Sequence, residues 1–367
     1  MEMALILFVA GMVVLHLLSC AVVGWRLHRE PPARPEAAPF ITLLRPVCGL
    51  DPLDAETLGS SFALEYPAFE VLFCVADGDD PVVPLVRRLI AAHPGVTARL
   101  LIGEDRVSAN PKLNNLEKGW QAAQGGLVVM ADSNLLLPPD YLWQVLAAQG
   151  AEVGLVSSPP VGIRPDGAWA ELECAFLNSN QARVQLLADT LGFGFAQGKT
   201  LMWERAFLDA RGGLAALGQR LAEDVAATKL VRGAGKRVAL TQRPFAQPIG
   251  RRSLRQVWSR QVRWAKVRRE GFAWLFAGEV LNGFAPVLLV AGMAGGPGFA
   301  AAVALVWYGA EAGLALACGW ARPGRALLML VLRDAMLPAV WAAGWANTRI
   351  EWRGNAMAPG ALHKLPG

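Results

Sequence analysis

The chain has 367 residues, of which 54% are apolar and only 18% are charged, against about 25% charged in ordinary soluble proteins. Thirteen tryptophans stand against three tyrosines, and tryptophan favours the interface of a bilayer. The five cysteines are scattered and form no CxxC pair, which argues against a disulfide framework or a structural zinc site. These features favour a membrane protein whose globular part faces a reducing compartment.

The first segment, from Met3 to Trp25, contains no Asp, Glu, Lys or Arg. Because about 20 apolar residues cross a bilayer as a helix, it predicts a transmembrane anchor over residues 1–26. A cleaved signal peptide is the alternative, and Leu17-Leu18-Ser19-Cys20 is similar to a lipoprotein cleavage site. Signal peptides begin with positive charge, whereas only Glu2 precedes this run, so we favour the anchor.

Positive charges follow the anchor at once, at Arg26, Arg29 and Arg34. By the positive-inside rule, the N-terminus lies outside and the chain after Trp25 begins in the cytosol. We therefore expect an integral protein of a bacterial inner membrane, with its main globular domain facing the cytosol.

Residues 39–248 have the pattern of an α/β domain. Short apolar runs rich in β-branched residues alternate with segments of helical spacing, such as Pro81–Ala92 and Pro111–Gln124, and this predicts a largely parallel sheet covered on both faces. Ligands of such sheets bind beyond the carboxyl ends of the strands, which is where Asp77 and Asp132 fall. The predicted strands are Phe40–Val47, Val71–Ala76, Ala98–Ile102, Leu127–Ala131 and Val153–Ser157.

The next segment, residues 249–278, is basic between Arg251 and Arg269 and has apolar residues at helical spacing. Basic residues and tryptophans on one amphipathic helix predict helices lying in the membrane interface, although such a cluster also suits nucleic acid or a phosphorylated substrate. Residues 279–348 predict further transmembrane or re-entrant helices, with breaks at Pro286 and at Gly295-Gly296-Pro297.

The last apolar stretch, Ala326–Ala346, carries Arg333 and Asp334. Charges at bilayer depth are costly, so we expect this stretch to be partly re-entrant or interfacial. The tail, residues 349–367, favours a cytosolic C-terminus through its basic residues Arg349, Arg353 and Lys364.

Three carboxylates are candidates for chemistry, and each has a plain structural alternative. Asp77 and Asp132 follow predicted strands and can bind a nucleotide or a divalent cation, but strand-end turns are rich in Asp for conformational reasons alone. Asp224 opens a helical segment, where an acidic residue is usually structural, yet it can also take a proton from an alcohol.

A pair of arginines three residues apart, Arg260 and Arg263, shares one helix face and can reach a diphosphate together. Trp264 either covers that site or lies at the membrane. The alternative is an arginine-rich surface helix.

Asp77, Asp132, Asp224 and the string Arg260-Gln261-Val262-Arg263-Trp264 follow the order D…D…D…(Q/R)xxRW of processive and lipid-directed glycosyltransferases with a GT-A fold. Further strings resemble the ceramide glucosyltransferase family, and the resemblance spans nearly the whole chain. They are Asn110-Pro111-Lys112-Leu113-Asn114-Asn115, Gly154-Leu155-Val156, Ala222-Glu223-Asp224 and Ile350-Glu351-Trp352-Arg353.

The resemblance implies an α/β GT-A-type nucleotide-sugar-binding domain with helical transmembrane and interfacial segments. It implies an inverting enzyme that transfers glucose from UDP-glucose to the primary hydroxyl of ceramide, giving β-glucosylceramide and UDP. The partners are then the donor, the lipid acceptor and the bilayer, with no nucleic acid. Phe272, Trp274, Leu275 and Phe276 are candidates for an apolar entrance to the acceptor site, or for simple interfacial anchors.

The same resemblance assigns a role to each site residue. Asp224 is the catalytic base; the nucleotide-sugar-binding residues are Asp77, Asp132, Lys112, Arg260, Arg263 and Trp264, and Asp132 also holds the metal, Mg²⁺ or Mn²⁺. The chain departs from a literal DxD metal site, because Asn134 stands where a second carboxylate is common, while Asp77-Gly78-Asp79 spells DxD. An exchange of roles between Asp77 and Asp132, and a weak dependence on metal, both stay open.

Two other functions stay open as well. A related lipid glycosyltransferase would act on a hopanoid or diacylglycerol acceptor, since acceptor pockets are apolar and difficult to infer from sequence. A membrane protein that binds anionic lipid without catalysis would explain the basic helix, but not three carboxylates at strand and helix ends.

Overall fold

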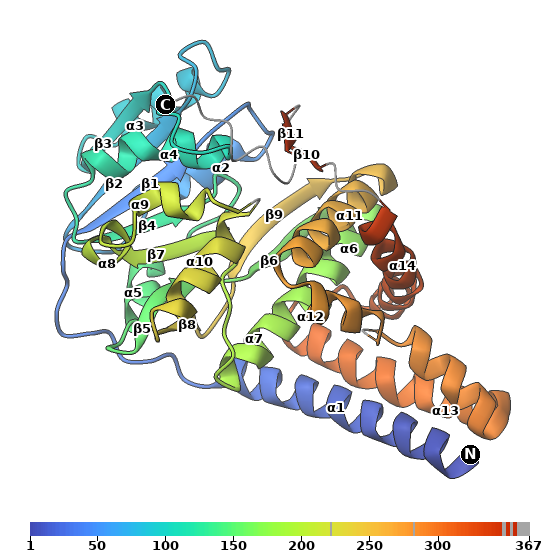
Figure 1. The fold of residues 1–367 in the computed structure, drawn as a ribbon. Coiled ribbons are helices and arrows are strands. Elements are labelled where there is room, and N and C mark those ends of the chain that lie inside the picture. Colours follow the sequence, from blue (N-terminus) through green and yellow to red (C-terminus); the bar gives the residue numbers. More distant parts are fainter. Residues whose placement is uncertain (221, 282, 347–349, 353–354, 358–367) are drawn as a thin grey trace. The chain divides into compact units, whose positions relative to one another are not determined.

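The computed structural model describes residues 1–220, 222–281, 283–346, 350–352 and 355–357. These form two compact units, which are treated separately (Figure 1). The helical unit comprises residues 1–29, 161–190 and 249–350, and the sheet unit comprises residues 30–160, 191–248 and 351–367. The basic tail residues Arg349, Arg353 and Lys364 lie outside the described residues.

The sheet unit is built on a seven-stranded sheet in the order β3-β2-β1-β4-β7-β5-β8. The pairs β1–β2, β1–β4, β2–β3 and β5–β8 are parallel, whereas β7 runs antiparallel to both β4 and β5. The strands are β1 (Ile41–Pro46), β2 (Phe69–Val75), β3 (Ala98–Ile102), β4 (Leu127–Ala131), β5 (Val153–Ser157), β7 (Thr200–Glu204) and β8 (Arg237–Leu240). All five strands expected from the sequence are present, and the sheet is mixed but mainly parallel.

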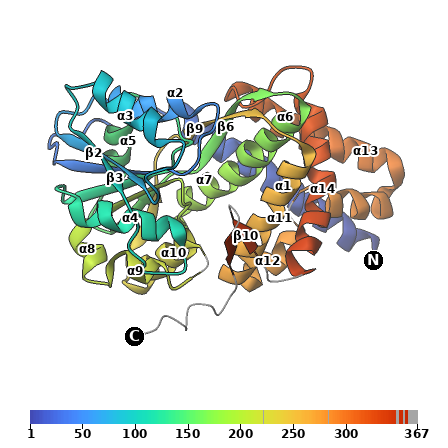
Figure 2. The same ribbon diagram turned by 90° about the horizontal axis from the view of Figure 1, so that it is seen from above.

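Two helical layers cover the sheet, as the view in Figure 2 shows, because the strands are apolar on both faces. One apolar core joins the sheet to α2, α3 and α5, and the other joins it to α4, α8, α9 and α10. The helices of this unit are α2 (Asp54–Gly59), a 3₁₀ turn (Ser60–Phe62), α3 (Val83–Ala92), α4 (Pro111–Ala122), α5 (Tyr141–Ala147), α8 (Arg205–Asp209), α9 (Gly213–Leu217) and α10 (Glu223–Gly233).

Four further strands form two small sheets. β6 (Pro160–Asp166) pairs with β9 (Phe245–Arg251), and the division between the two units falls within these strands. β10 (Ile350–Trp352) pairs with β11 (Asn355–Met357).

The helical unit contains three helices that are long and apolar enough to cross a membrane: α1 (Glu2–His28), α13 (Ala285–Ala317) and α14 (Ala326–Ala346). Its other elements are α6 (Ala168–Ala175), a π-helical turn (Phe176–Ala182), α7 (Arg183–Thr190), α11 (Leu254–Gly271), α12 (Ala273–Gly278) and a 3₁₀ turn (Glu279–Leu281). An apolar core that includes Val9, Val287 and Val303 joins α1 to α13. The predicted anchor at the N-terminus is therefore a continuous helix packed on a second apolar helix.

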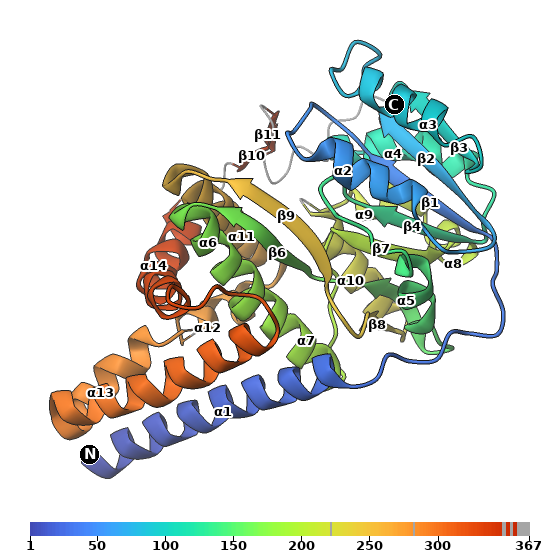
Figure 3. The ribbon, with the colours of Figure 1, turned by 180° about the vertical axis from the view of Figure 1, so that it is seen from behind.

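The path of α13 changes sharply at Gly296, whose φ of 74° lies in the left-handed region that favours glycine. Figures 1 and 3 show the two halves of α13 side by side, with the reversal between them. The break expected at Gly295-Gly296-Pro297 is thus present. The break expected at Pro286 is not, because this proline lies in the first turn of α13, where a missing N–H costs nothing.

A buried cluster of charged groups holds α14 to its neighbours within the helical unit. Arg333 binds both Glu311 of α13 and Asp334, whose Oδ1 lies 2.6 Å from Arg333 Nη2, and Arg333 Nη1 donates to Ser179 Oγ at 2.8 Å. Arg333, Glu311 and Asp334 are each at most 2% exposed. These charges are paired inside a continuous helix of 21 residues. The expectation that this stretch is partly re-entrant or interfacial stays a prediction.

Candidate functional site

Asp132 lies directly beyond the end of β4 and is held by two lysines. Its Oδ1 lies 2.7 Å from Lys112 Nζ, and its Oδ2 lies 2.8 Å from Lys199 Nζ. Burial alone would raise the pKa of Asp132, but the two ammonium groups outweigh it and hold the pKa well below its usual range. With a side chain 23% exposed, this carboxylate is ionised and still open to a ligand.

Lys112 occupies the centre of this polar cluster because α4 begins with a well-formed cap. Asn110 accepts the Lys112 backbone N–H at 3.0 Å and Pro111 takes the first helical position. The Lys112 ammonium then donates to Asp132, to Glu223 Oε1 at 2.7 Å and to the Gly198 carbonyl at 2.8 Å. Burial opposes its charge, but the two carboxylates raise the pKa of Lys112 above its ordinary value.

Asp224 lies in the first turn of α10, next to Glu223. Its Oδ1 accepts the Val225 N–H at 2.8 Å, and its Oδ2 accepts the Gly198 N–H at 3.3 Å. Burial and the neighbouring Glu223 carboxylate raise the pKa of Asp224 to about 6, although both hydrogen bonds act in the opposite direction. A carboxyl with this pKa is well suited to accept a proton near neutral pH. Glu223 and Gly198 both contact Lys112, so Asp224 belongs to the same cluster.

Asp77 follows the end of β2, two strands away from β4 in the order β2-β1-β4. These three strands are parallel, so Asp77 and Asp132 lie at the same edge of the sheet, about 10 Å apart by strand spacing. Asp77 is exposed, and its Oδ1 accepts the Asp79 N–H at 3.0 Å. Its carboxylate thus faces solvent at the edge where ligands of such sheets bind.

The two arginines and the tryptophan of the basic string lie on α11, in the helical unit. A capping box at Ser253 and Gln256 starts this helix. Arg260 Nη1 binds Glu173 Oε1 of α6 at 2.8 Å, and the Arg260 guanidinium lies 5.7 Å from the centre of the Trp264 ring. The Arg263 side chain is half-buried. Arg260 and Trp264 are therefore in contact, and both are already engaged in the packing of this unit.

Two residues of the polar cluster around Lys112 and Asp132 were not predicted as site residues, namely Lys199 and Glu223. Lys199 precedes β7, and β7 pairs with β4 so that Thr200 lies opposite Ala131. This antiparallel pairing brings Lys199 beside Asp132, and nothing near Lys199 in the sequence indicates it. Glu223 could have been found, since it adjoins Asp224.

Of the four residues expected at an apolar entrance, two have strongly exposed side chains that could line it. Trp274 is 92% exposed and Leu275 is 71% exposed, whereas Phe276 is 1% exposed and packs on Ala265 and Val340. The expectation for Phe276 is wrong, because its ring belongs to the core between α11, α12 and α14.

A divalent cation would find convergent oxygen ligands beside Asp132. Lys199 Nζ lies 2.8 Å from Asp132 Oδ2 and 2.9 Å from Asn134 Oδ1, so both oxygens already point at one positive group. Within the described part of the chain, no group of three or more His, Cys, Asp or Glu is arranged to bind a metal. The residues thus fit a cation that is held mainly by the ligand's own phosphates, as Mg²⁺ often is.

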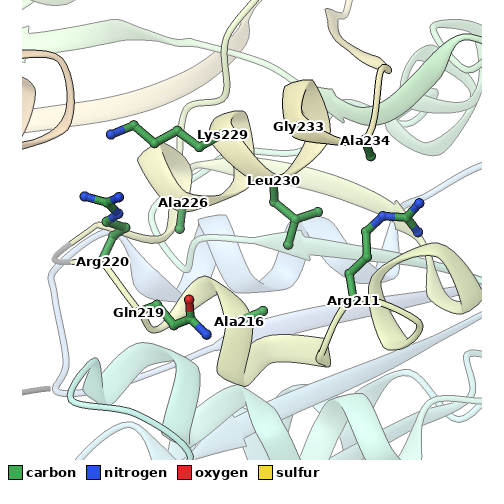
Figure 4. A pocket seen from close by; sticks show the side chains of 9 residues that line it. All are labelled: Arg211, Ala216, Gln219, Arg220, Ala226, Lys229, Leu230, Gly233 and Ala234. Atoms are coloured by element: carbon green, nitrogen blue, oxygen red, sulfur yellow. The ribbon is translucent and has the colours of Figure 1, made fainter. Parts of the chain in front are cut away.

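A large hollow of the sheet unit, about 660 Å³, lies between α9 and α10. Figure 4 shows its basic side chains, Arg211, Arg220 and Lys229, at the rim. None of the seven predicted site residues lines it. The hollow and the polar cluster around Lys112 and Asp132 are therefore separate features of this unit.

Comparisons with solved structures identify the fold. A mannosyltransferase from Pyrobaculum calidifontis, solved with GDP-Man and Mn²⁺, matches 95% of this chain and 97% of its own, with a TM-score of 0.54 and 18% identity. At that identity the likeness shows the fold alone, and it confirms the predicted GT-A-like architecture.

Curated relatives match the sequence itself. Ceramide glucosyltransferase 1 of Caenorhabditis elegans is 28% identical over 264 residues, which are 71% of this chain and 56% of the relative. Ceramide glucosyltransferase of Komagataella phaffii is 27% identical over 288 residues, or 62% of this chain and 56% of the relative. The chain thus spans about half the length of these relatives. The model of glycosyl transferase family 21 matches residues 11–361, and the chain therefore belongs to that family.

Proposed function

We propose that this glycosyltransferase moves glucose from UDP-glucose to the primary hydroxyl of ceramide, giving β-glucosylceramide and UDP. The observation that carries the proposal is the family match over residues 11–361, together with relatives named ceramide glucosyltransferase in a nematode and in fungi. The ionised cluster at the sheet edge supports it, because it offers a base and a set of cations in the place where a nucleotide sugar binds in α/β folds.

Asp224 is the base in this proposal. Its carboxylate takes the proton of the ceramide hydroxyl while the hydroxyl oxygen forms a bond to the anomeric carbon of glucose. The bond from that carbon to the UDP oxygen breaks in the same step, and UDP leaves with the electron pair. One displacement inverts the configuration, so an α-linked donor gives a β-glucoside.

The donor is held by charge in the same proposal. Asp77 accepts hydrogen bonds from the uridine, and Lys112 binds the diphosphate. Arg260 and Arg263 stabilise the negative charge that develops on the leaving UDP, and Trp264 shields it from water. The ammonium groups that bind Asp132 can also bind the diphosphate, since phosphate oxygens accept hydrogen bonds from the same donors.

Asp132 and Asn134 would hold Mg²⁺ or Mn²⁺ together with the diphosphate. When bound, the cation neutralises charge on the diphosphate and makes UDP a better leaving group. Lys199 then has to release Asp132 and bind phosphate instead. We expect EDTA to suppress transfer and added Mg²⁺ or Mn²⁺ to restore it; full activity in EDTA would contradict the role of the metal but not that of Asp132.

The chain is a membrane protein in this proposal, with the sheet unit in the cytosol beside the bilayer. Three apolar helices, the exposed Trp274 and Leu275, and the basic α11 support the assignment. A cysteine placed at Ala33, in a background without the native cysteines, should resist impermeant thiol reagents in intact cells and react after permeabilisation. Labelling in intact cells would contradict this orientation.

The reaction itself is tested with purified enzyme, UDP-[¹⁴C]glucose and a panel of ceramide, diacylglycerol and hopanoid acceptors. We expect label in hexosylceramide, with an anomeric proton coupling that reports a β linkage. Label only in diacylglycerol or hopanoid would overturn the choice of acceptor. An α linkage would overturn the single displacement.

A further inference from the structure

A small cavity with several polar and charged side chains in its lining lies inside the helical unit, next to the loop that joins α13 to α14. It measures about 240 Å³ and is lined by β6, α6, the π-helical turn and the loop itself. Glu171, Asn178, Trp320, Arg322 and Arg325 line it. None of these residues belongs to the proposed transfer reaction.

The floor of the cavity is rigid because Asn178 ties two segments together. This side chain is 1% exposed; its Oδ1 accepts the Gly162 N–H at 2.6 Å. Its Nδ2 donates to the carbonyls of Gly162 at 3.0 Å and Trp320 at 3.4 Å. The loop is thereby fixed to β6, so the cavity is a built site rather than a gap between moving parts.

Glu171 has a carboxylate oxygen in this cavity that accepts no hydrogen bond from the described residues. Its side chain is 7% exposed, and its Oε1 lies 3.5 Å from Arg322 Nη1 and 3.4 Å from Arg325 Nη1. Its other oxygen, Oε2, is buried without a hydrogen-bond partner among the described residues. A buried carboxylate oxygen is costly to leave unpaired, so the site calls for a ligand that brings a hydrogen-bond donor, best a positive one.

Arg322 and Arg325 at the rim of the cavity favour a negatively charged group. Arg322 and Arg325 share one oxygen of Glu171 at long distances, and their side chains are 61% and 59% exposed. A guanidinium has five N–H donors in a planar fork that suits phosphate oxygens. The rim therefore favours an anionic group, while Glu171 favours a cationic one a few ångströms away.

The position of the loop indicates where such a ligand comes from. Residues 318–325 connect two helices that are apolar enough to cross a membrane, so the cavity lies at one end of both helices. Trp320 is the kind of residue that lies at headgroup level. The volume is below the roughly 300–1,000 Å³ of pockets that enclose a whole small molecule, so it suits a headgroup.

We propose that this cavity binds the phosphoethanolamine headgroup of a membrane phospholipid. The ammonium donates to Glu171 Oε2, and the phosphate accepts from Arg322 and Arg325. A choline headgroup lacks the N–H donors that Glu171 requires, and a glycerol headgroup lacks the positive charge. The acyl chains stay in the bilayer beside α13 and α14.

The test uses the purified full chain, equilibrated with equal amounts of phosphatidylethanolamine, phosphatidylcholine and phosphatidylglycerol, with retained lipid measured by native mass spectrometry. Choline lipid cannot make the charge-assisted hydrogen bond to Glu171, so we expect ethanolamine lipid to be retained roughly tenfold over choline lipid. Glu171→Gln should abolish this preference, and Arg322→Gln with Arg325→Gln should lower retention of both lipids.

Two controls keep the test decisive. Arg88→Gln, an exposed position on α3, removes the same charge outside the cavity and should retain ethanolamine lipid normally. Ala321→Phe, on the loop, fills the cavity without removing a charge and should lower retention even if Glu171→Gln fails to fold. Equal retention of all three lipids by the native protein, or displacement of bound lipid by soluble phosphoethanolamine at equal concentration, would overturn the proposal.

Discussion

The two units each contain a cluster of paired charges, and the clusters differ in their access to solvent. In the sheet unit, Lys112, Lys199 and Asp132 have side chains between 10% and 23% exposed. In the helical unit, Arg333 and Glu311 are at most 2% exposed. The ion pairs of the two clusters have similar lengths but differ in how easily they are exchanged. A side chain that reaches water can give up its partner for a ligand, whereas a fully buried side chain keeps its partner.

This difference reflects the cost of separating charges. Breaking a fully buried pair leaves an uncompensated charge in a poorly polarisable environment. At the sheet edge, water or a diphosphate can replace each lost contact, so the same step costs little. Reactivity is thus expected at the sheet edge and mechanical constraint among the helices.

The largest effect is expected from Arg333→Leu. It leaves Glu311 and Asp334 without their main partner, and removing one member of a buried pair costs about 3–5 kcal/mol. Thermal unfolding in detergent should show a large loss of stability, and Arg333→Lys should recover part of it. Lys199→Met, which breaks a partly exposed pair, should unfold close to the native protein. Equal losses in both variants would remove the distinction between the clusters.

Asp224→Asn should lower the turnover number by roughly 10²-fold or more, the usual scale for losing a positioned base. The amide keeps the size of the side chain but cannot accept the proton. UDP binding, measured by calorimetry, should be unchanged, and Glu204→Gln on β7 is the matched control at an exposed position. Near-normal turnover would exclude Asp224 from the mechanism.

Lys199→Met should weaken the binding of UDP-glucose by about ten- to a hundredfold, the range for losing one hydrogen bond to a charged group. The effect should appear in KM more than in kcat, because in the proposed function Lys199 holds the diphosphate before and during the reaction. Lys236→Met should bind the donor normally, because the Lys236 ammonium donates to the Ala151 carbonyl and lies 5.7 Å from the centre of the Phe207 ring, away from the cluster around Asp132. A loss confined to kcat would argue against a binding role.

The pH dependence of kcat/KM should report Asp224. The base must be unprotonated, and its pKa is raised to about 6, so activity should fall about tenfold per pH unit below 6 and level off above it. Asp132 should add no second limb near pH 6, since its pKa is held well below the usual range. The residual activity of Asp224→Asn should lack this limb, and a limb that persists there would belong to another group.

Much of the fold could be predicted from the sequence because its signals are local. The runs ending before Asp77 and Asp132 are strands, and the apolar segment after Met3 is one helix, since side-chain periodicity and length determine both. The reversal at Gly296 was also indicated by neighbouring residues. The family assignment depended on motifs that lie far apart yet keep their order.

The remainder depends on contacts between distant segments. Lys199 reaches Asp132 only because β7 enters the sheet antiparallel to β4, and Glu311 meets Arg333 only because α13 and α14 pack together. The roles given to Asp77, Asp224 and Arg260 stay predictions, although the structure brings Asp224 into the cluster around Lys112.

The buried position of Arg333 has a consequence for how the protein is made. Arg and Asp at the centre of a helix each oppose insertion from the translocon by about 2.5–3.5 kcal/mol, and α14 carries one of each side by side. The partner that neutralises Arg333 most closely, Glu311, is synthesised earlier, on α13. Once the arginine is paired with it, the penalty for entering lipid falls. We therefore expect α14 to enter the bilayer as a pair with α13 rather than alone.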